Sequence, residues 1–340
     1  MPYKVSRGVN EMTKRTRYVV FGALAVLLVG LCTGLVAYYT GMPMGAFGQA
    51  SGPQELRYVP ADAAVVAYAN VREVMESDLR GRLHKKIPEH DRDGREEFEQ
   101  ATGIDIERDI DRVVAFMSPG VEKRYTGMVV ATGRFDVGRL EALAREHHGS
   151  VEEYRGTRLV TKAFEHDGND HTSGKSMTIA FLGPGLIGLG ETDVVKAAID
   201  RQGGQSILDN GELMELVKDI DDANAWAVGR FDALMSQANL PEHVTSRIPA
   251  VRWFSASGHI NGGISGLIRA EARDEQAAQN LRDVIQGFLA LARMQSGSQP
   301  QMQSLVNSLQ LSGTGTTVAL SFQIPTAVID AFGEDKQPVE

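Results

Sequence analysis

Cysteine is almost absent from this chain, because Cys32 is the only one in 340 residues. It lies within an apolar run near the N-terminus, so the remainder has no thiol for a disulfide or a thiolate metal site. Stability must therefore come from burial of apolar side chains. The roughly 285 residues that follow residue 55 are enough for two hydrophobic cores of ordinary domain size.

Positive charge is scarce outside the first 17 residues. The whole chain carries a formal net charge of −9 and residues 1–17 contribute +4, so the remainder carries −13. Binding to nucleic acid requires clustered Lys and Arg that neutralise phosphates, and binding to anionic lipid headgroups requires the same charge. The acidic remainder therefore argues against both kinds of partner.

Charged side chains are missing from residues 18–39, a run of 22 positions. A helix of this length spans roughly 33 Å, and the hydrocarbon core of a bilayer is about 30 Å thick. Because basic residues precede the run, the sequence predicts a cytoplasmic N-terminus at 1–17 and a transmembrane helix at 18–39. The expected location is the inner (cytoplasmic) membrane, with the later domains extracytoplasmic, in the periplasm.

Two further hypotheses concern this segment. Cleavage of a secretory signal after Ala50 is the rival to an uncleaved signal anchor, because Gly48 and Ala50 place small residues at the two required positions. Gly30 and Gly34 form a G-x-x-x-G spacing that lets two helices approach closely, which suggests a homodimer through this face.

Strand and helix patterns follow a charge-free linker, rich in glycine and proline, at 40–55. They predict an α+β fold with two repeated β-α-β-β-α-β units, each an antiparallel sheet with helices packed on one face. The first α+β domain is expected at 56–208, the second at 209–332 and a tail at 333–340.

A repeated tetrapeptide supports the predicted duplication. The sequence Gly-Arg-Phe-Asp occurs at 133–136 and again at 229–232, each time where a predicted strand meets a predicted helix. Asp and Asn are preferred at helix N-caps, since their side chains accept hydrogen bonds from the first free backbone amides. The expected N-caps are Asn70, Asp136, Asp232 and Asp274.

The glycine spacing from Gly183 to Gly188 matches the dinucleotide-binding fingerprint. In that fold the helix begins within the motif, so that its N-terminus meets the pyrophosphate. Here the cap signals at Thr192 and Asp193 come only later. The Pro-Gly pair at 184–185 is therefore predicted to form a tight turn between two antiparallel strands.

The densest cluster of metal-ligating side chains lies in the predicted loop at 165–171. Imidazoles and carboxylates together can bind zinc or a similar cation, although polar residues are also usual in loops. A metal- or small-ligand-binding sensor is therefore the alternative function, without an assigned metal site. The residues in question are Glu165, His166, Asp167, Asp170 and His171.

Sequence motifs of known hydrolases are missing, because the chain has neither G-x-S-x-G nor H-E-x-x-H. His259, near Ser255 and Ser257, is the least implausible member of a serine–histidine pair in this sequence. A membrane-tethered hydrolase is therefore the third hypothesis. We assign no catalytic or cofactor-binding residue, and we expect a protein that is not an enzyme and uses no cofactor.

Four turn and strand-flanking motifs carry a resemblance to a known family. They are Val59-Pro60-Ala61-Asp62, Gly103-Ile104-Asp105, Glu153-Tyr154-Arg155-Gly156 and residues 204–220. With these motifs the chain resembles a family of bacterial membrane-anchored envelope proteins whose duplicated α+β ectodomain is a domain of unknown function. The likeness covers residues 56–240 and implies the fold and the location, but no activity.

The leading functional hypothesis is a scaffold or protein-interaction module of the bacterial envelope. The predicted anchor and spacer would hold the acidic domains outside the membrane, where their sheet and loop surfaces meet another envelope protein. The hypothesis names no partner, because the sequence contains no recognised interaction motif.

Overall fold

The computed structural model describes residues 53–77, 99, 103–120, 125–146, 148–163, 176–201, 204–233, 250–260, 263–296 and 300–326. Among these residues no helix is both long and apolar enough to cross a membrane. The predicted architecture is corrected to this extent, that the described elements include no membrane-spanning helix. Residues 1–17, the segment 18–39 with Gly30 and Gly34, and the tail at 333–340 lie outside the described residues.

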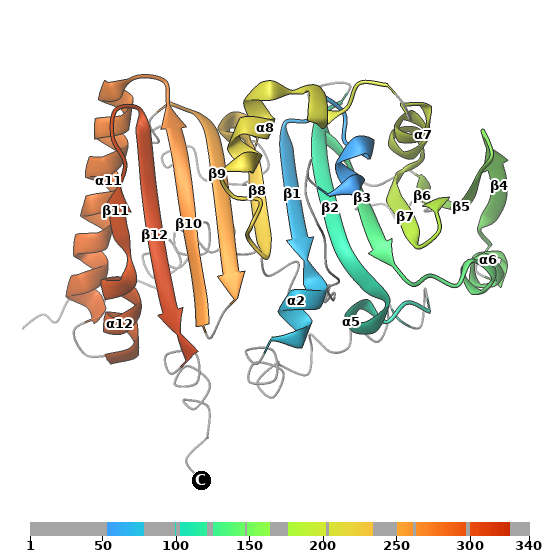
Figure 1. Cartoon of the computed structure of the whole chain (residues 1–340), viewed down its shortest axis with the longest axis horizontal. Coiled ribbons are helices and arrows are strands. Elements are labelled where there is room, and N and C mark those ends of the chain that lie inside the picture. The colour runs from blue at the N-terminus through green and yellow to red at the C-terminus, as the bar shows by residue number, and fades with distance from the viewer. Residues whose placement is uncertain are drawn as a thin grey trace, which may run out of the picture.

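Twelve antiparallel strands form one continuous sheet, in the order β11-β12-β10-β9-β8-β1-β2-β3-β7-β6-β5-β4 (Figure 1). β8 and β1 are neighbours near the middle of this sheet, and β11 and β4 are its two edges. The strands are β1 (Val65–Asn70), β2 (Ile110–Pro119), β3 (Tyr125–Gly133), β4 (Ser150–Tyr154), β5 (Thr157–Ala163), β6 (Ser176–Gly183), β7 (Leu186–Glu191), β8 (Ala225–Arg230), β9 (Val251–Ile260), β10 (Gly263–Ala272), β11 (Gln310–Ser312) and β12 (Thr317–Pro325).

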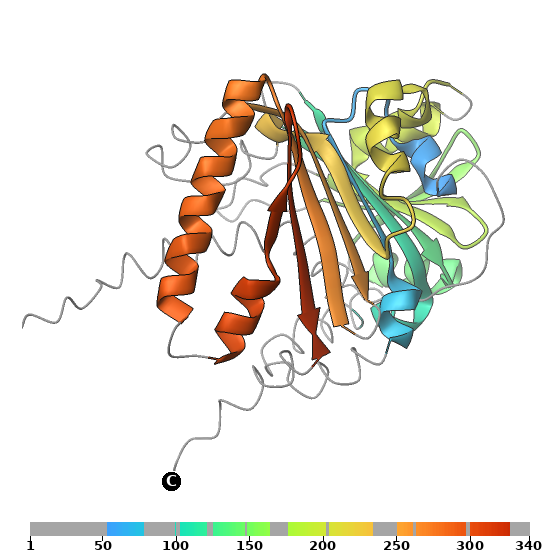
Figure 2. The same cartoon turned by 60° about the vertical axis from the view of Figure 1, so that its left-hand side comes forward.

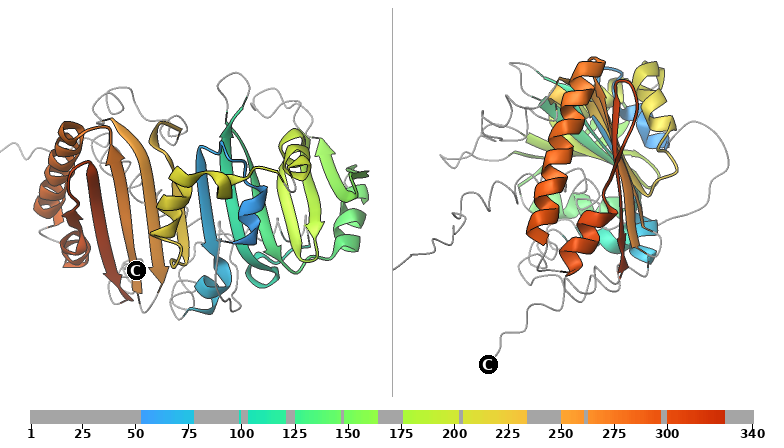
Figure 3. Two further views of the ribbon diagram at one scale, coloured as in Figure 1. Left: turned by 45° about the horizontal axis from the view of Figure 1, so that its top comes forward. Right: turned by 90° about the vertical axis from the view of Figure 1, so that its left-hand side faces the viewer.

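Helices lie on both faces of this sheet, where the sequence predicted one covered face. Figure 2 shows α11 and α12 on one side and α8 and η1 on the other, and the end-on view in Figure 3 agrees. The helices are η1 (Gln54–Tyr58), α2 (Val71–Glu76), α5 (Ile106–Asp109), α6 (Val137–Glu146), α7 (Thr192–Asp200), η3 (Ile207–Asp209), α8 (Gly211–Lys218), α11 (Glu275–Gln295) and α12 (Pro300–Ser308).

The prediction of two repeated β-α-β-β-α-β units with separate sheets is wrong. β1 and β8, each expected to open its own domain, pair with one another from Val65 opposite Gly229 to Ala69 opposite Ala225. Four strands, β4 to β7, lie between α6 and α7, whereas α11 and α12 follow one another directly before β11. The β1–β8 pairing satisfies backbone groups that two separate sheets would each leave at an open edge.

The main core is shared by both halves of the sheet. Successive strand residues point to opposite faces, and Val66, Val114, Val130 and Val228 all lie on the same face, at most 1% exposed. Ile207 of η3 belongs to the same cluster. The domain boundary expected between residues 208 and 209 therefore lies within a helical turn that packs on this core. Burial of each such side chain stabilises the fold by roughly 1.5–3 kcal/mol.

A buried ion pair fastens η1 to the sheet. The Glu55 carboxylate is fully buried, lies 3.3 Å from Arg112 Nε and accepts a hydrogen bond from Thr132 Oγ1. Tyr68 is close to the same charges, and burial raises the pKa of its hydroxyl to about 12. Removal of one partner of such a pair leaves an uncompensated buried charge, so η1, β2 and β3 are held together strongly.

Two of the predicted N-caps are confirmed. Asp136 accepts a hydrogen bond from Arg139 N at 2.9 Å, and Asp274 accepts one from Ala277 N at 2.7 Å. Asn70 does precede α2, but its side chain forms no capping hydrogen bond. The helix after β3 and the long helix α11 therefore begin where the sequence predicted.

Candidate functional site

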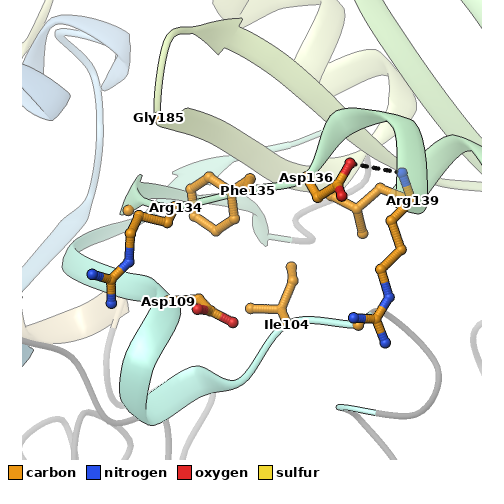
Figure 4. Close-up of a pocket in the computed structure, with 10 residues that line it drawn as sticks. Ile104, Asp109, Arg134, Phe135, Asp136, Arg139 and Gly185 are labelled. Atoms are coloured by element: carbon orange, nitrogen blue, oxygen red, sulfur yellow. Dashed lines mark hydrogen bonds between the residues drawn. The ribbon is translucent and has the colours of Figure 1, made fainter.

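A cavity of about 590 Å³ lies where β2 begins, β3 ends and α6 begins. We call it the junction cavity (Figure 4). Its lining comes from four separate parts of the chain, and the Gly-Arg-Phe-Asp sequence at 133–136 supplies four of the ten residues. The lining residues are Gly103, Ile104, Asp109, Gly133, Arg134, Phe135, Asp136, Arg139, Leu140 and Gly185.

Close backbone contacts bring these segments together. Gly133 N donates a hydrogen bond to Gly185 O at 2.8 Å, and Arg134 N donates one to Asp109 O at 2.5 Å. A Cβ atom on Gly133 would clash with Asp109 O, and one on Gly185 would lie 2.6 Å from Gly133 O. Gly185 also has a φ of +65°, which favours glycine. The turn predicted at 184–185 therefore joins β6 to β7, as expected, and closes one side of the cavity.

The two carboxylates of the cavity each bind a backbone amide. Asp136 Oδ1 accepts from Arg139 N, which caps α6, and Asp109 Oδ2 accepts from Asp105 N at 2.8 Å. These hydrogen bonds hold the carboxylates in place at the ends of α6 and α5. Each carboxylate keeps its negative charge, and among the described residues neither forms an ion pair with Arg134 or Arg139.

Two arginines of the cavity have charges that the described residues leave unneutralised. Arg134 and Arg139 are both exposed, and within the described part of the chain neither forms an ion pair. In Figure 4 their guanidinium groups lie on opposite sides of the view, with Asp109 and Ile104 between them. Each guanidinium is a planar group with five N–H donors and no acceptor. The cavity therefore offers unused hydrogen-bond donors at two places.

The Arg139 side chain passes close to the Gly103 backbone. A Cβ atom at residue 103 would come within 2.7 Å of Arg139 Cζ, so the guanidinium lies directly over the Gly103 backbone. Gly103 also has a φ of +71°, a conformation that L side chains rarely adopt. Only glycine at this position allows the guanidinium to pack so closely.

Apolar side chains line the remainder of the cavity. Ile104 and Leu140 are each 5% exposed and belong to a core cluster on the sheet face that α6 covers. Phe135 is partly exposed and packs against the same cluster. The cavity thus combines an apolar wall with two guanidiniums and two carboxylates.

The second Gly-Arg-Phe-Asp sequence, at 229–232, has no such free cation. Arg230 Nη2 lies 2.6 Å from Asp232 Oδ2 and Arg230 Nε lies 3.1 Å from Asp232 Oδ1, a two-point ion pair. The hydrogen bonds from Arg230 lower the pKa of the Asp232 carboxyl, and the same contact raises the pKa of Arg230. Asp232 Oδ1 also accepts a hydrogen bond from the adjacent Ala233 N at 2.9 Å. The residues after Ala233 lie outside the described ones, so the N-cap expected at Asp232 stays a prediction.

The structure does not show His259 hydrogen-bonded to Ser255 or Ser257, the pair that the hydrolase hypothesis requires. Ser255, Ser257 and His259 lie on β9, and Ser255 is buried. Among the described residues His259 Nε2 has Asp222 Oδ1 as its charged neighbour, at 3.8 Å, and no hydrogen bond joins it to either serine. The described residues also contain no cluster of three potential metal ligands. The loop at 165–171 lies outside them.

A second exposed surface lies on α11. Val284, Phe288, Leu291 and Met294 follow one another at helical spacing, and Phe288 and Leu291 are each 52% exposed. Exposed apolar stripes of this kind mark interaction surfaces more often than isolated apolar residues do. We call these four residues the α11 stripe.

Comparisons with known proteins add little to the site. No family model matches this chain, and no curated protein matches it. Among solved structures, the crystal form I structure of TP0453 is similar, with a TM-score of 0.46 and 8% identity, over 83% of this chain and 96% of that one. This likeness is too distant to support a function, and the resemblance to membrane-anchored envelope proteins stays a prediction.

The sequence shows the repeated tetrapeptide at 133–136 but does not indicate the cavity. Asp136 was expected only to cap a helix, which it does, and Arg134 received no role. A usable signal was the repetition of an arginine at both strand-to-helix junctions. Its meaning depended on Gly103, Arg139 and Gly185, which the chain brings from distant positions.

Proposed function

We propose that this chain is a non-enzymatic interaction protein that binds a segment of another protein in the junction cavity. The observation that carries the proposal is the pair of exposed arginines, Arg134 and Arg139, without ion-pair partners among the described residues, beside an apolar wall. A volume of about 590 Å³ lies within the roughly 300–1,000 Å³ typical of binding pockets. Arginine and aromatic residues are also enriched in protein interfaces.

The groups in the cavity favour binding over catalysis. Among the described residues, its lining includes no serine, cysteine, histidine or lysine that could serve as a nucleophile. The two aspartates, Asp109 and Asp136, each bind a backbone amide, a role that fixes local structure. Fixed donors and apolar surface are what recognition of a partner segment requires.

We also propose that this domain works outside the cytoplasm. The support is the sequence alone, in which basic residues precede an apolar run at 18–39. Protease added to intact spheroplasts should then degrade the described domain, with a cytoplasmic protein as the protected control. Protection of the domain until the cells are permeabilised would contradict this location.

The interaction is tested by photo-crosslinking in cells. A benzophenone side chain at Phe135 should give a discrete adduct with one partner, because an aromatic group at that place faces the cavity. The same group at Leu208, which is 39% exposed and is not a lining residue of the cavity, is the matched control. Equal adducts from both positions, or none from Phe135, would contradict the proposal.

The α11 stripe supplies the competing surface within the same class of function. A benzophenone at Phe288 is therefore the third arm of the experiment. An adduct from Phe288 without one from Phe135 would move the interaction to α11. The sensor hypothesis for the 165–171 loop and the hydrolase hypothesis for Ser255, Ser257 and His259 stay predictions, and calorimetry with zinc, copper and calcium tests the first of them.

A further inference from the structure

We infer that the junction cavity recognises an acidic peptide segment in which two carboxylates flank an apolar residue. The inference rests on the proposed function and names the chemistry of its partner. Three features of the cavity define this occupant: the two free guanidiniums, the apolar wall between them and one carboxylate acceptor.

The two guanidiniums call for two acidic groups. Arg134 directly follows β3 and Arg139 lies in the first turn of α6, and Figure 4 shows their guanidinium groups on opposite sides of the view. Hydrogen bonds between arginine and a carboxylate are charge-assisted and often two-pronged, which makes them stronger than neutral ones. An occupant with a single carboxylate would satisfy one arginine and leave the other unused.

The apolar wall calls for an apolar group between those carboxylates. Ile104 lies between the two arginines in Figure 4, and Phe135 presents a partly exposed ring. An aliphatic or aromatic side chain placed here removes apolar surface from water, which favours binding by roughly 25 cal/mol per Å². A purely polar dianion would gain nothing from this surface.

Asp109 favours a peptide over a small dicarboxylate. Its Oδ2 already accepts a hydrogen bond from Asp105 N, whereas Oδ1 can accept another from the occupant. A peptide supplies a backbone N–H donor between two acidic side chains, and a free dicarboxylate supplies none. Without such a donor, the Asp109 charge repels a dianion.

Gly103 sets the position of one of the two arginines. Because the Arg139 guanidinium lies over the Gly103 backbone, a side chain at residue 103 must displace it. Gly103 is thus a positioning residue, and Arg134 and Arg139 are the residues that bind.

The test uses two fluorescein-labelled peptides, Gly-Ser-Glu-Leu-Glu-Ser-Gly and its neutral counterpart Gly-Ser-Gln-Leu-Gln-Ser-Gly, with affinity read from fluorescence anisotropy on the purified protein. The acidic peptide should bind at least tenfold more tightly than the neutral one. Arg134→Gln or Arg139→Gln should each weaken it by roughly tenfold, and the double variant by about a hundredfold. Arg230→Gln, in the second tetrapeptide, is the matched control and should leave the affinity unchanged.

Every other outcome overturns the inference. Equal binding of the two peptides, no binding of the acidic one, or an unchanged affinity of the double variant excludes acidic recognition by these arginines. Competition by glutarate as effective as that by the unlabelled peptide would assign the cavity to a small dicarboxylate instead. Circular dichroism confirms that each variant is folded, as expected for exposed side chains.

The two proposals fail separately. A partner captured from Phe135 in cells, together with no binding of the acidic peptide, leaves the interaction function standing and removes only the acidic chemistry. Tight binding of the acidic peptide with no adduct from Phe135 supports the chemistry and removes the cellular interaction.

Discussion

The same four residues, Gly-Arg-Phe-Asp, end a strand at two places in this molecule and produce two different surfaces. At 229–232 the arginine is held by the aspartate two residues later, in a two-point ion pair. At 133–136 the aspartate caps α6 instead, by accepting from Arg139 N. The arginine beside it is therefore free to act on something else.

This difference shows how a local backbone choice decides the chemistry of a surface. A carboxylate that accepts from a backbone amide of its own helix is unavailable to a neighbouring cation. Capping stabilises a helix by about 1 kcal/mol, whereas an exposed ion pair is worth roughly 0–1 kcal/mol. Capping of α6 is therefore the more stabilising of the two interactions open to Asp136. As a result, Arg134 has no ion-pair partner among the described residues.

The largest expected difference in stability is between loss of Arg112, which pairs with the buried Glu55, and loss of Arg230, the exposed arginine of the second tetrapeptide. Arg112→Ala leaves the fully buried Glu55 carboxylate without its cationic partner, so the free energy of unfolding should fall by about 3–5 kcal/mol. Arg230→Ala removes an exposed pair and should lower it by at most about 1 kcal/mol. Urea unfolding measures both, and equal losses would refute the contrast.

Replacement of the first glycine of either tetrapeptide should lower the stability by a similar amount, whereas replacement of the two arginines that follow should have different effects. A Cβ atom on Gly133 would clash with Asp109 O, and one on Gly229 would lie 2.5 Å from Ala64 O. Gly133→Ala and Gly229→Ala should each lower the free energy of unfolding by about 1–3 kcal/mol, because backbone must shift. Gly258→Ala is the control, since its nearest neighbour outside the strand is 4.0 Å away, and thermal melts compare the three variants.

The two aspartates should differ in the direction that their hydrogen bonds indicate. Asp136→Ala removes a helix cap and should lower the free energy of unfolding by about 1 kcal/mol. Asp232→Ala removes an exposed pair and the hydrogen bond accepted from the adjacent Ala233 N, and should lower it by less than the loss of the Asp136 cap does. A larger loss for Asp232→Ala in chemical denaturation would mean that the roles of the two carboxylates have been assigned the wrong way round.

The smallest effect concerns the titration of Asp232. Its pKa is lowered in the folded protein by hydrogen bonds from Arg230, so its contribution to stability is present above the ordinary carboxyl pKa. That contribution is lost as the pH falls through the lowered pKa. In Arg230→Gln the pKa of Asp232 should return toward its ordinary value, as followed by carboxyl NMR shifts. Arg134→Gln should leave that pKa unchanged.

Local features of the fold could be predicted from the sequence. Asp136 and Asp274 begin their helices as expected, and Pro184-Gly185 forms the expected turn. Each of these structures depends on residues a few positions apart, whose preferences act within a single turn. For the same reason the dinucleotide interpretation of the glycines at 183–188 was correctly set aside.

The arrangement of strands could not be predicted in the same way. The sequence pattern indicates which face of a strand is buried, but the β1–β8 pair and the run β7-β6-β5-β4 depend on partners far along the chain. Two repeated domains would bury the same alternating residues, such as Val66 and Val228, as one shared sheet does. The junction cavity was missed for a related reason, since residues 103, 133 and 185 meet only in the folded chain.

The central claim is that Arg134 and Arg139 are free to bind an acidic segment while Arg230 is not. NMR spectra of the arginine Nε–H groups, recorded as the Glu-Leu-Glu peptide is added, observe all three side chains in one sample. The resonances of Arg134 and Arg139 should shift with a common saturation curve while that of Arg230 stays in place. Equal shifts of all three, or a shift of Arg230 alone, would contradict the account.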